Sequence, residues 1–314
     1  MNRNEGNELY LKAQKLALRD YREKMLAGQS PFLPVLDDIL QNVPVENQIP
    51  LGQVDIPLNL LVGTKTTGRT AAFASNFMPL LDLKTEFASK WVNLCLSHLE
   101  EGIRDPIRCY EYMGRFYVQE GNKRVSVLKY FDATSILGNV IRIVPQYSED
   151  PAVQMYYEFM HYYPITQTYL LTFTKPGSYG RLQKAMGKSP EEKWTAEDRA
   201  AILSLYNWVE KAYTALGGDK LRATVGDVLL LLLRLYSMEE LTKASPNELQ
   251  QKIDALWDDV LALQNDDPVT VSEKPAEPAQ TKLLERILPI HPAAPTHLKV
   301  AFIHERTPET SSWT

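Results

Sequence analysis

Cysteine, long apolar runs and an excess of basic residues are all missing from this sequence. Its two cysteines, Cys95 and Cys109, are too few for a disulfide framework, and we expect buried thiols. No apolar run approaches the ~20 residues of a membrane-spanning helix, since the leucines of 229–233 end at Arg234. A formal net charge of −5 argues against a general polyanion binder, which would present a basic domain.

The N-terminal sequence is polar as well. Residues 1–8 lack the apolar core of a secretory signal. The hydrophobic fraction of 44% and the charged fraction of 23% are those of a globular protein, and 314 residues allow about two domains. We therefore expect a cytoplasmic protein with no membrane partner.

Residues 115–130 predict a strand, a tight turn and a helix. Apolar and polar residues alternate from 116 to 119, Gly121 allows the positive φ of a sharp reversal, and apolar residues at 125, 128 and 131 form one helical stripe. Lys123 and Arg124 then lie in the first turn, where the free N–H groups of a helix disfavour cations. This pattern indicates a site for an anion such as phosphate. The alternative is a surface turn whose basic residues face water.

The loop 63–70 is a second candidate for phosphate binding. It contains two glycines, four threonines and two cations, among them Thr66, Thr67 and Arg69. Such a flexible, donor-rich loop can wrap a phosphate, although it lacks the Gly-Lys-Ser/Thr ending of a P-loop. An ordinary exposed loop remains the alternative.

The segment Glu120-Gly-Asn-Lys-Arg-Val-Ser-Val resembles the G-E-R-R-x-R-A box of the ParB/sulfiredoxin-like superfamily, which reads G-N-x-R in looser members. Residues 98–108 resemble the preceding box of that family, a helix that ends in glycine and is followed by a proline and a strand. The resemblance covers about residues 50–147, with a first strand expected over 53–62. It implies an α+β fold with a small mixed domain.

The resemblance also implies a ligand. ParB relatives bind the triphosphate of CTP, and the sulfiredoxin branch binds ATP, through the helix N-terminus and the basic residues of the second box. Carried over, residues 120–124 would hold the phosphates and the preceding box would shape the opposite wall. The residues expected to line this nucleotide site are Glu120, Gly121, Asn122, Lys123, Arg124, Gly102, Pro106, Thr66, Thr67 and Arg69.

Catalysis is disfavoured because the sequence departs from the family at one position. Asn122 stands where sulfiredoxin has its nucleophilic cysteine and where ParB has a glutamate associated with metal-assisted hydrolysis. An amide is neither a carboxylate base nor a charged ligand. Glu120 is one position away, which leaves a nucleotide hydrolase or nuclease as the alternative, although neighbouring residues point differently. We predict no catalytic residue and no protein metal site, and leave the need for Mg²⁺ open.

The remaining sequence divides into four parts. Residues 1–49 predict an N-terminal helix and a proline-rich arm, and 148–263 predict a helical domain with helices over 195–216, 224–237 and 246–263. Residues 186–262 carry nine Lys/Arg against thirteen Asp/Glu, so a DNA-binding helix-turn-helix is disfavoured there. A protein partner of this helical domain, with the sheet domain acting as an inert scaffold, is a further alternative.

The C-terminal sequence predicts a linker and the start of another domain. Residues 264–297 are proline-rich and typical of disorder. Residues 298–314 resemble the first strand of a basic membrane protein (BMP) family substrate-binding domain, so the chain would be the N-terminal part of a BMP-type protein. Together these features predict a non-catalytic nucleotide-binding regulatory or sensor module.

Overall fold

A computed structural model of the chain describes residues 2–263, apart from the side chain of Arg69. The fold is mixed α/β with one five-stranded sheet, which confirms the expected fold class at that level. The predicted linker at 264–297 and the predicted strand at 298–314 lie outside the described residues.

The sheet combines parallel and antiparallel neighbours in the order β1-β5-β3-β4-β2. β1 and β5 are antiparallel, as are β3 and β4, whereas β3–β5 and β2–β4 are parallel pairs. The strands are β1 (Val45–Pro57), β2 (Leu61–Thr64), β3 (Ile107–Tyr112), β4 (Arg115–Glu120) and β5 (Ser135–Pro145). The single strand expected over 53–62 is wrong, because β1 ends at Pro57 and the 3₁₀ turn Leu58–Leu60 separates it from β2.

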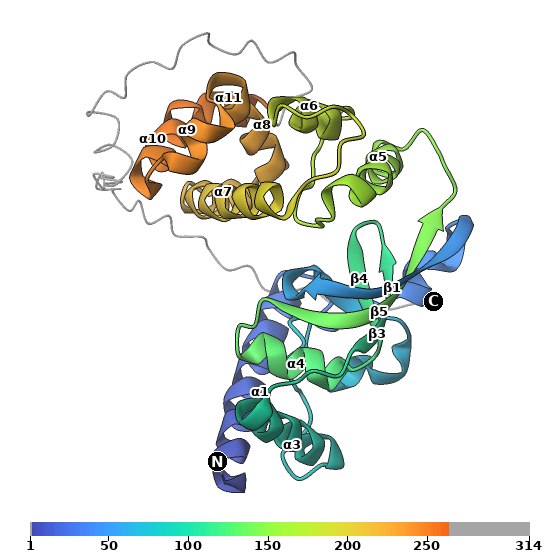
Figure 1. The fold of residues 1–314 in the computed structure, drawn as a ribbon. Helices are drawn as coiled ribbons and strands as arrows, with labels where there is room; N and C mark the ends of the chain where they lie inside the picture. The colour runs from blue at the N-terminus through green and yellow to red at the C-terminus, as the bar shows by residue number, and fades with distance from the viewer. Residues whose placement is uncertain (1, 264–314) are drawn as a thin grey trace, which may run out of the picture. The chain divides into compact units, whose positions relative to one another are not determined.

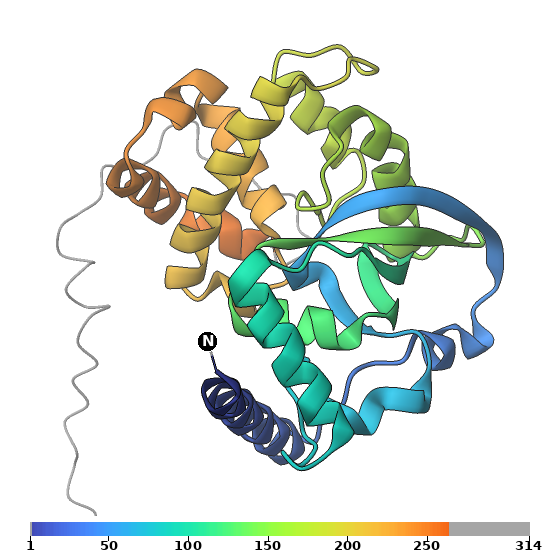
Figure 2. The ribbon, with the colours of Figure 1, turned by 60° about the horizontal axis from the view of Figure 1, so that its bottom comes forward.

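Four helices accompany the sheet: α1 (Arg3–Leu26), α2 (Leu36–Ile39), α3 (Glu86–Glu101) and α4 (Asn122–Tyr130). α1 and α3 lie side by side (Figures 1 and 2), and the ring of Tyr10 meets that of Trp91 edge to face at 5.4 Å. α3 begins at its cap Thr85, whose hydroxyl accepts from the N–H of Ala88, and it ends at Gly102 with φ 79°. The helix predicted from the 98–108 box and the helix after Gly121 are both confirmed.

One face of the sheet is apolar at one end and carries buried charged residues at the other. Ile107, Cys109 and Glu111 alternate along β3 and so share a face, together with their pairing partners on β4 and β5. At the Ile107 end, Val125 and Leu128 of α4 join the same apolar core. At the Glu111 end, the residues that contact this face come from the helical segment after 150.

That segment contains seven helices, listed here: α5 (Pro151–Thr166), α6 (Ser178–Ala185), α7 (Ala196–Ala215), α8 (Val225–Leu235), α9 (Met238–Lys243), α10 (Pro246–Ala255) and α11 (Trp257–Ala262). The predictions for α7 and α8 are confirmed, whereas the one helix expected over 246–263 is two, with a break at Leu256. α9 was not predicted. Among residues 2–263, no helix has the length and apolar character to cross a bilayer.

Candidate functional site at the box of residues 120–124

Three segments of the predicted site meet at one edge of the sheet. β2 and β4 are parallel, so the loops that follow them emerge at the same edge, and the N–H of Lys65 donates to the Val118 carbonyl at 2.8 Å. β3 runs antiparallel to β4 and pairs Arg108 with Glu120. The loop at 65–70, the start of β3 and the box of residues 120–124 therefore converge.

The turn between β4 and α4 requires glycine. Gly121 has φ 112°, in the region that side chains rarely adopt, and it is the residue that precedes the first turn of α4. A Cβ at this position would lie 2.4 Å from Cγ2 of Ile107. The close approach brings the box against the start of β3, so the backbone of both segments is fixed.

The N-terminus of α4 differs from those of most other described helices. Its cap residue, Gly121, has no side chain to accept from the N–H groups of the first turn. α6 has the same kind of cap, Gly177, but there the carboxylate of Glu158 accepts from the N–H of Gly177 at 2.7 Å and of Tyr179 at 2.9 Å. α6 therefore shows how an anion occupies a glycine-capped helix start in this chain.

Arg124 connects the box of residues 120–124 to the loop that precedes β3. Its Nη1 donates to the carbonyl oxygens of Asp105 at 2.9 Å and of Pro106 at 2.8 Å. Its Nη2 lies 4.0 Å from Oε1 of Glu120. The predicted wall residue Pro106 is thus adjacent to the box, but part of the Arg124 guanidinium is occupied by protein carbonyls. Its role is to hold the loop before β3 and to contribute positive charge.

Lys123 is directed toward α3. Its Nζ lies 4.6 Å from the centre of the Phe87 ring, a cation–π contact. The two cations of the first turn are therefore held by neighbouring segments, Lys123 by α3 and Arg124 by the loop before β3. Their charge remains near the helix start, where an anionic ligand would be attracted.

Asn122 carries the least satisfied polar group of the box. The residue is 8% exposed, and its Oδ1 is buried with no hydrogen-bond partner among the described residues. A buried acceptor without a donor costs about 1–3 kcal/mol, so such groups are uncommon in folded proteins. Because this oxygen is closed off from solvent, a ligand's donor would reach it only after a local rearrangement.

The other predicted residues are less tightly assembled. Glu120 is exposed and its Oε2 lies 3.8 Å from Nε of Arg108. Gly102 ends α3 with a positive φ of 79°, and a Cβ added there would meet no atom within 4 Å. Thr66 and Thr67 are exposed at the edge that carries the box. The side chain of Arg69 lies outside the described part of the chain.

The reactive side chains near this edge are a buried thiol and an exposed carboxylate. In the described part of the chain, no three His, Cys, Asp or Glu residues are grouped as metal ligands would be. The Cys109 thiol lies on the same sheet face, and burial raises its pKa to about 12, so it is a thiol and not a thiolate nucleophile. Within residues 120–124, Glu120 is the one carboxylate, and it directly precedes the cap residue Gly121.

A buried polar cluster was missed by sequence reasoning. Glu111, fully buried, pairs with Nε of Arg142 on β5 and accepts from the hydroxyl of Tyr156 and from the N–H of Gly114 at 2.7 Å. Arg142 Nη2 also donates to the Tyr169 hydroxyl at 2.8 Å. Burial raises the pKa of Glu111, and its partners act in the opposite direction. The sequence does contain a sign of this cluster. Glu111 follows Ile107 and Cys109 at alternate positions of β3, so its side chain lies on the same buried face.

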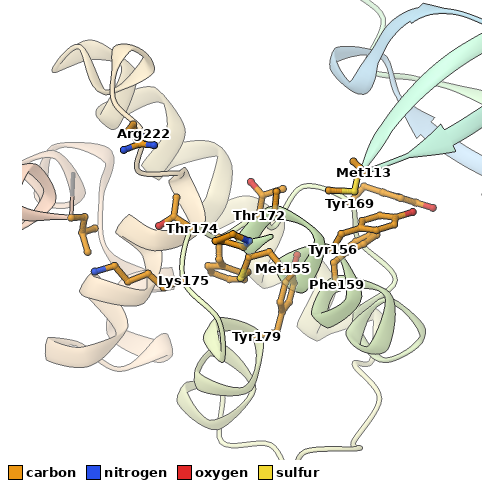
Figure 3. A pocket seen from close by; sticks show the side chains of 15 residues that line it. Met113, Met155, Tyr156, Phe159, Tyr169, Thr172, Thr174, Lys175, Tyr179 and Arg222 are labelled. Atoms are coloured by element: carbon orange, nitrogen blue, oxygen red, sulfur yellow. The ribbon is translucent and has the colours of Figure 1, made fainter. Parts of the chain in front are cut away.

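A large cavity lies away from the box, among the aromatic residues that follow position 150 (Figure 3). Neither the box nor the threonine loop contributes to its lining.

Comparison with known proteins identifies neither site, since no protein-family model and no curated protein matches the chain.

Proposed function

We propose that the chain is a nucleotide-binding or phosphate-binding regulatory module of the ParB-like superfamily, without catalytic activity, and the N-terminal part of a BMP-type ligand-binding protein. The observation that carries the proposal is the start of α4, where a helix without a capping side chain stands beside the unpartnered Oδ1 of Asn122. The ParB/sulfiredoxin-like architecture of residues 50–147 and the helical domain at 148–263 belong to the same proposal.

A nucleotide carries both the hydrogen-bond acceptors and the hydrogen-bond donor that would complement the groups at this edge. Phosphate oxygens accept from the N–H groups at a helix N-terminus and interact with nearby cations. A ribose hydroxyl or a base amine donates, which would satisfy Oδ1 of Asn122 once a local rearrangement exposed that atom. Inorganic phosphate at neutral pH provides mainly the first kind of contact. We therefore favour CTP or ATP, with or without Mg²⁺, over free phosphate.

Hydrolysis is the alternative, and Asn122 argues against it. The amide cannot deprotonate a water molecule, and Glu120, the nearby carboxylate, is exposed and faces Arg108 and Arg124 at 3.8 and 4.0 Å. The scaffold alternative, with a protein partner on the helical segment, needs no ligand at all. DNA is disfavoured by the acidic balance of that segment.

The test is calorimetric titration of the chain with CTP, ATP and GTP, each with and without Mg²⁺. Asn122→Leu removes the amide and keeps the branching and the number of side-chain heavy atoms. We expect it to weaken nucleotide binding by about tenfold, as for loss of one hydrogen bond of ~1.5 kcal/mol. Lys90→Gln, an exposed substitution on α3, serves as the control and should bind as the wild type does.

Each result decides between the candidates. Absence of binding for all three nucleotides would refute the proposal and favour the scaffold. Release of phosphate that depends on Glu120 would replace it with a hydrolase. Equal affinity in Asn122→Leu and Lys90→Gln would move the site away from the start of α4.

A further inference from the structure

A cavity of about 570 Å³ opens between the β3–β4 turn and the helical segment. Its volume falls in the range of about 300–1,000 Å³ that is usual for small-molecule sites. Met113 and Gly114 of the turn line one part, and residues of α5, of the segment 169–175 and of α6, together with Arg222 and Leu263, line the rest. It shares no residue with the box of residues 120–124.

One end of this cavity is apolar and aromatic. Met113, Phe159 and Tyr169 gather there, and Met155 and Tyr179 lie between this end and the other (Figure 3). Thioether side chains adapt to irregular apolar surfaces, and aromatic side chains offer large contact areas. This end suits a hydrocarbon or ring-bearing body.

The opposite end is polar and cationic. Thr174, Lys175 and Arg222 lie on that side in Figure 3, Thr172 lies nearer the middle, and no Asp or Glu belongs to the lining of the cavity. Lys175 and Arg222 come from two different loops, and their positive charge favours an anionic group in the ligand.

An adjoining cavity of about 600 Å³ increases the positive charge at this end. It shares Lys175 and Leu263 with the first and adds Arg181, Lys184 and Arg234 over a floor of leucines from α8. Its one lining carboxylate, Asp227, already accepts from the N–H of Thr224 at 2.8 Å and of Thr174 at 3.1 Å. A chain of net charge −5 thus concentrates five lysines and arginines here.

We propose that the 570 Å³ cavity binds a small amphiphilic organic acid. The apolar body lies between the methionines and aromatic rings, and the carboxylate, sulfonate or phosphate group lies beside Lys175 and Arg222. The site is separate from the nucleotide site proposed above and does not depend on it, because the two share no residue.

The probe for this site is 8-anilinonaphthalene-1-sulfonate, an aromatic anion whose fluorescence rises on burial, titrated onto the full chain. N-phenyl-1-naphthylamine has the same ring system without the charge. We expect saturable binding of the anion at one site. Lys175→Gln should weaken the anion by about tenfold, the effect of one charge-assisted hydrogen bond, and leave the neutral probe unchanged.

Two further variants keep the test decisive. Lys193→Gln, an exposed lysine outside both cavities, is the matched control and should bind both probes normally. Ala152→Trp fills the cavity from an exposed lining position and should weaken both probes. The proposal is overturned by absence of saturable binding, by equal anion affinity in the two lysine variants, or by anion binding that survives Ala152→Trp.

Discussion

Three residues of the box perform separate tasks at the start of α4. Gly121 provides the backbone conformation and leaves room for Ile107, and Arg124 ties the preceding loop to the helix. Asn122 is left with a buried acceptor that no described residue satisfies. The first two tasks stabilise the fold with or without a ligand. For that reason Asn122 separates binding from stability more cleanly than Gly121 or Arg124 does.

Lys129 on α4 gives a pH-dependent prediction at the same scale. Burial lowers the pKa of its ammonium group from 10.5 to about 8, and its Nζ lies 5.3 Å from the Phe77 ring. Between these two pKa values the unfolded chain still binds the proton that the folded chain has released. The free energy of unfolding therefore rises with pH above about 8, by about 1–2 kcal/mol up to pH 9.5.

Urea unfolding of wild type and Lys129→Met at pH 7, 8, 9 and 9.5 measures this contribution. We expect the variant to lack the rise and to be the more stable protein at pH 7, since it no longer has a buried ammonium group. Lys90→Met, at an exposed position of α3, should follow the wild type. A parallel pH dependence in Lys129→Met would show that other groups cause it.

At the scale of elements, Glu111 and Arg142 connect two strands to the helical segment. β3 supplies the carboxylate, β5 the guanidinium, and Tyr156 of α5 a hydroxyl that bonds the carboxylate at 2.8 Å. Arg142 also lies 5.4 Å from the centre of the Phe159 ring on α5. A buried charge pair of this kind contributes orientation more than net stability, but each partner depends on the other.

Removing one partner should therefore be costly. Arg142→Met leaves the Glu111 carboxylate buried without its counter-ion, and we expect a loss of about 3–5 kcal/mol in the free energy of unfolding. The double variant Glu111→Gln/Arg142→Met should lose less than the sum of the two single variants. Arg108→Met, which removes an exposed guanidinium of β3, should cost less than about 1 kcal/mol. Additive losses in the double variant would mean that the pair is not coupled.

At the scale of the molecule, local patterns predicted elements better than they predicted contacts. The period of the apolar residues and the caps located α1, α3, α4, α7 and α8, because these signals lie within one element. The role of Arg124 depends on carbonyl groups 18 and 19 residues earlier, and that of Glu111 on β5 and α5. Such partners are set by topology, which one residue pattern does not contain. The turn at Gly121 and the helix after it could be predicted, whereas the cavity could not, since its lining comes from segments between 113 and 263.

The described chain should unfold as one cooperative unit. A continuous apolar core contains Ile107 and Phe116 of the sheet as well as Leu229 of α8, and the Phe116 and Tyr169 rings meet at 5.0 Å. Native-state hydrogen exchange followed by mass spectrometry measures this directly. Peptides from β3 and from α8 should reach the same highest free energy of opening, because neither segment can lose this core alone. Arg142→Met should lower both values equally, whereas a lower plateau for α8 alone would show that the helical segment opens independently of the sheet.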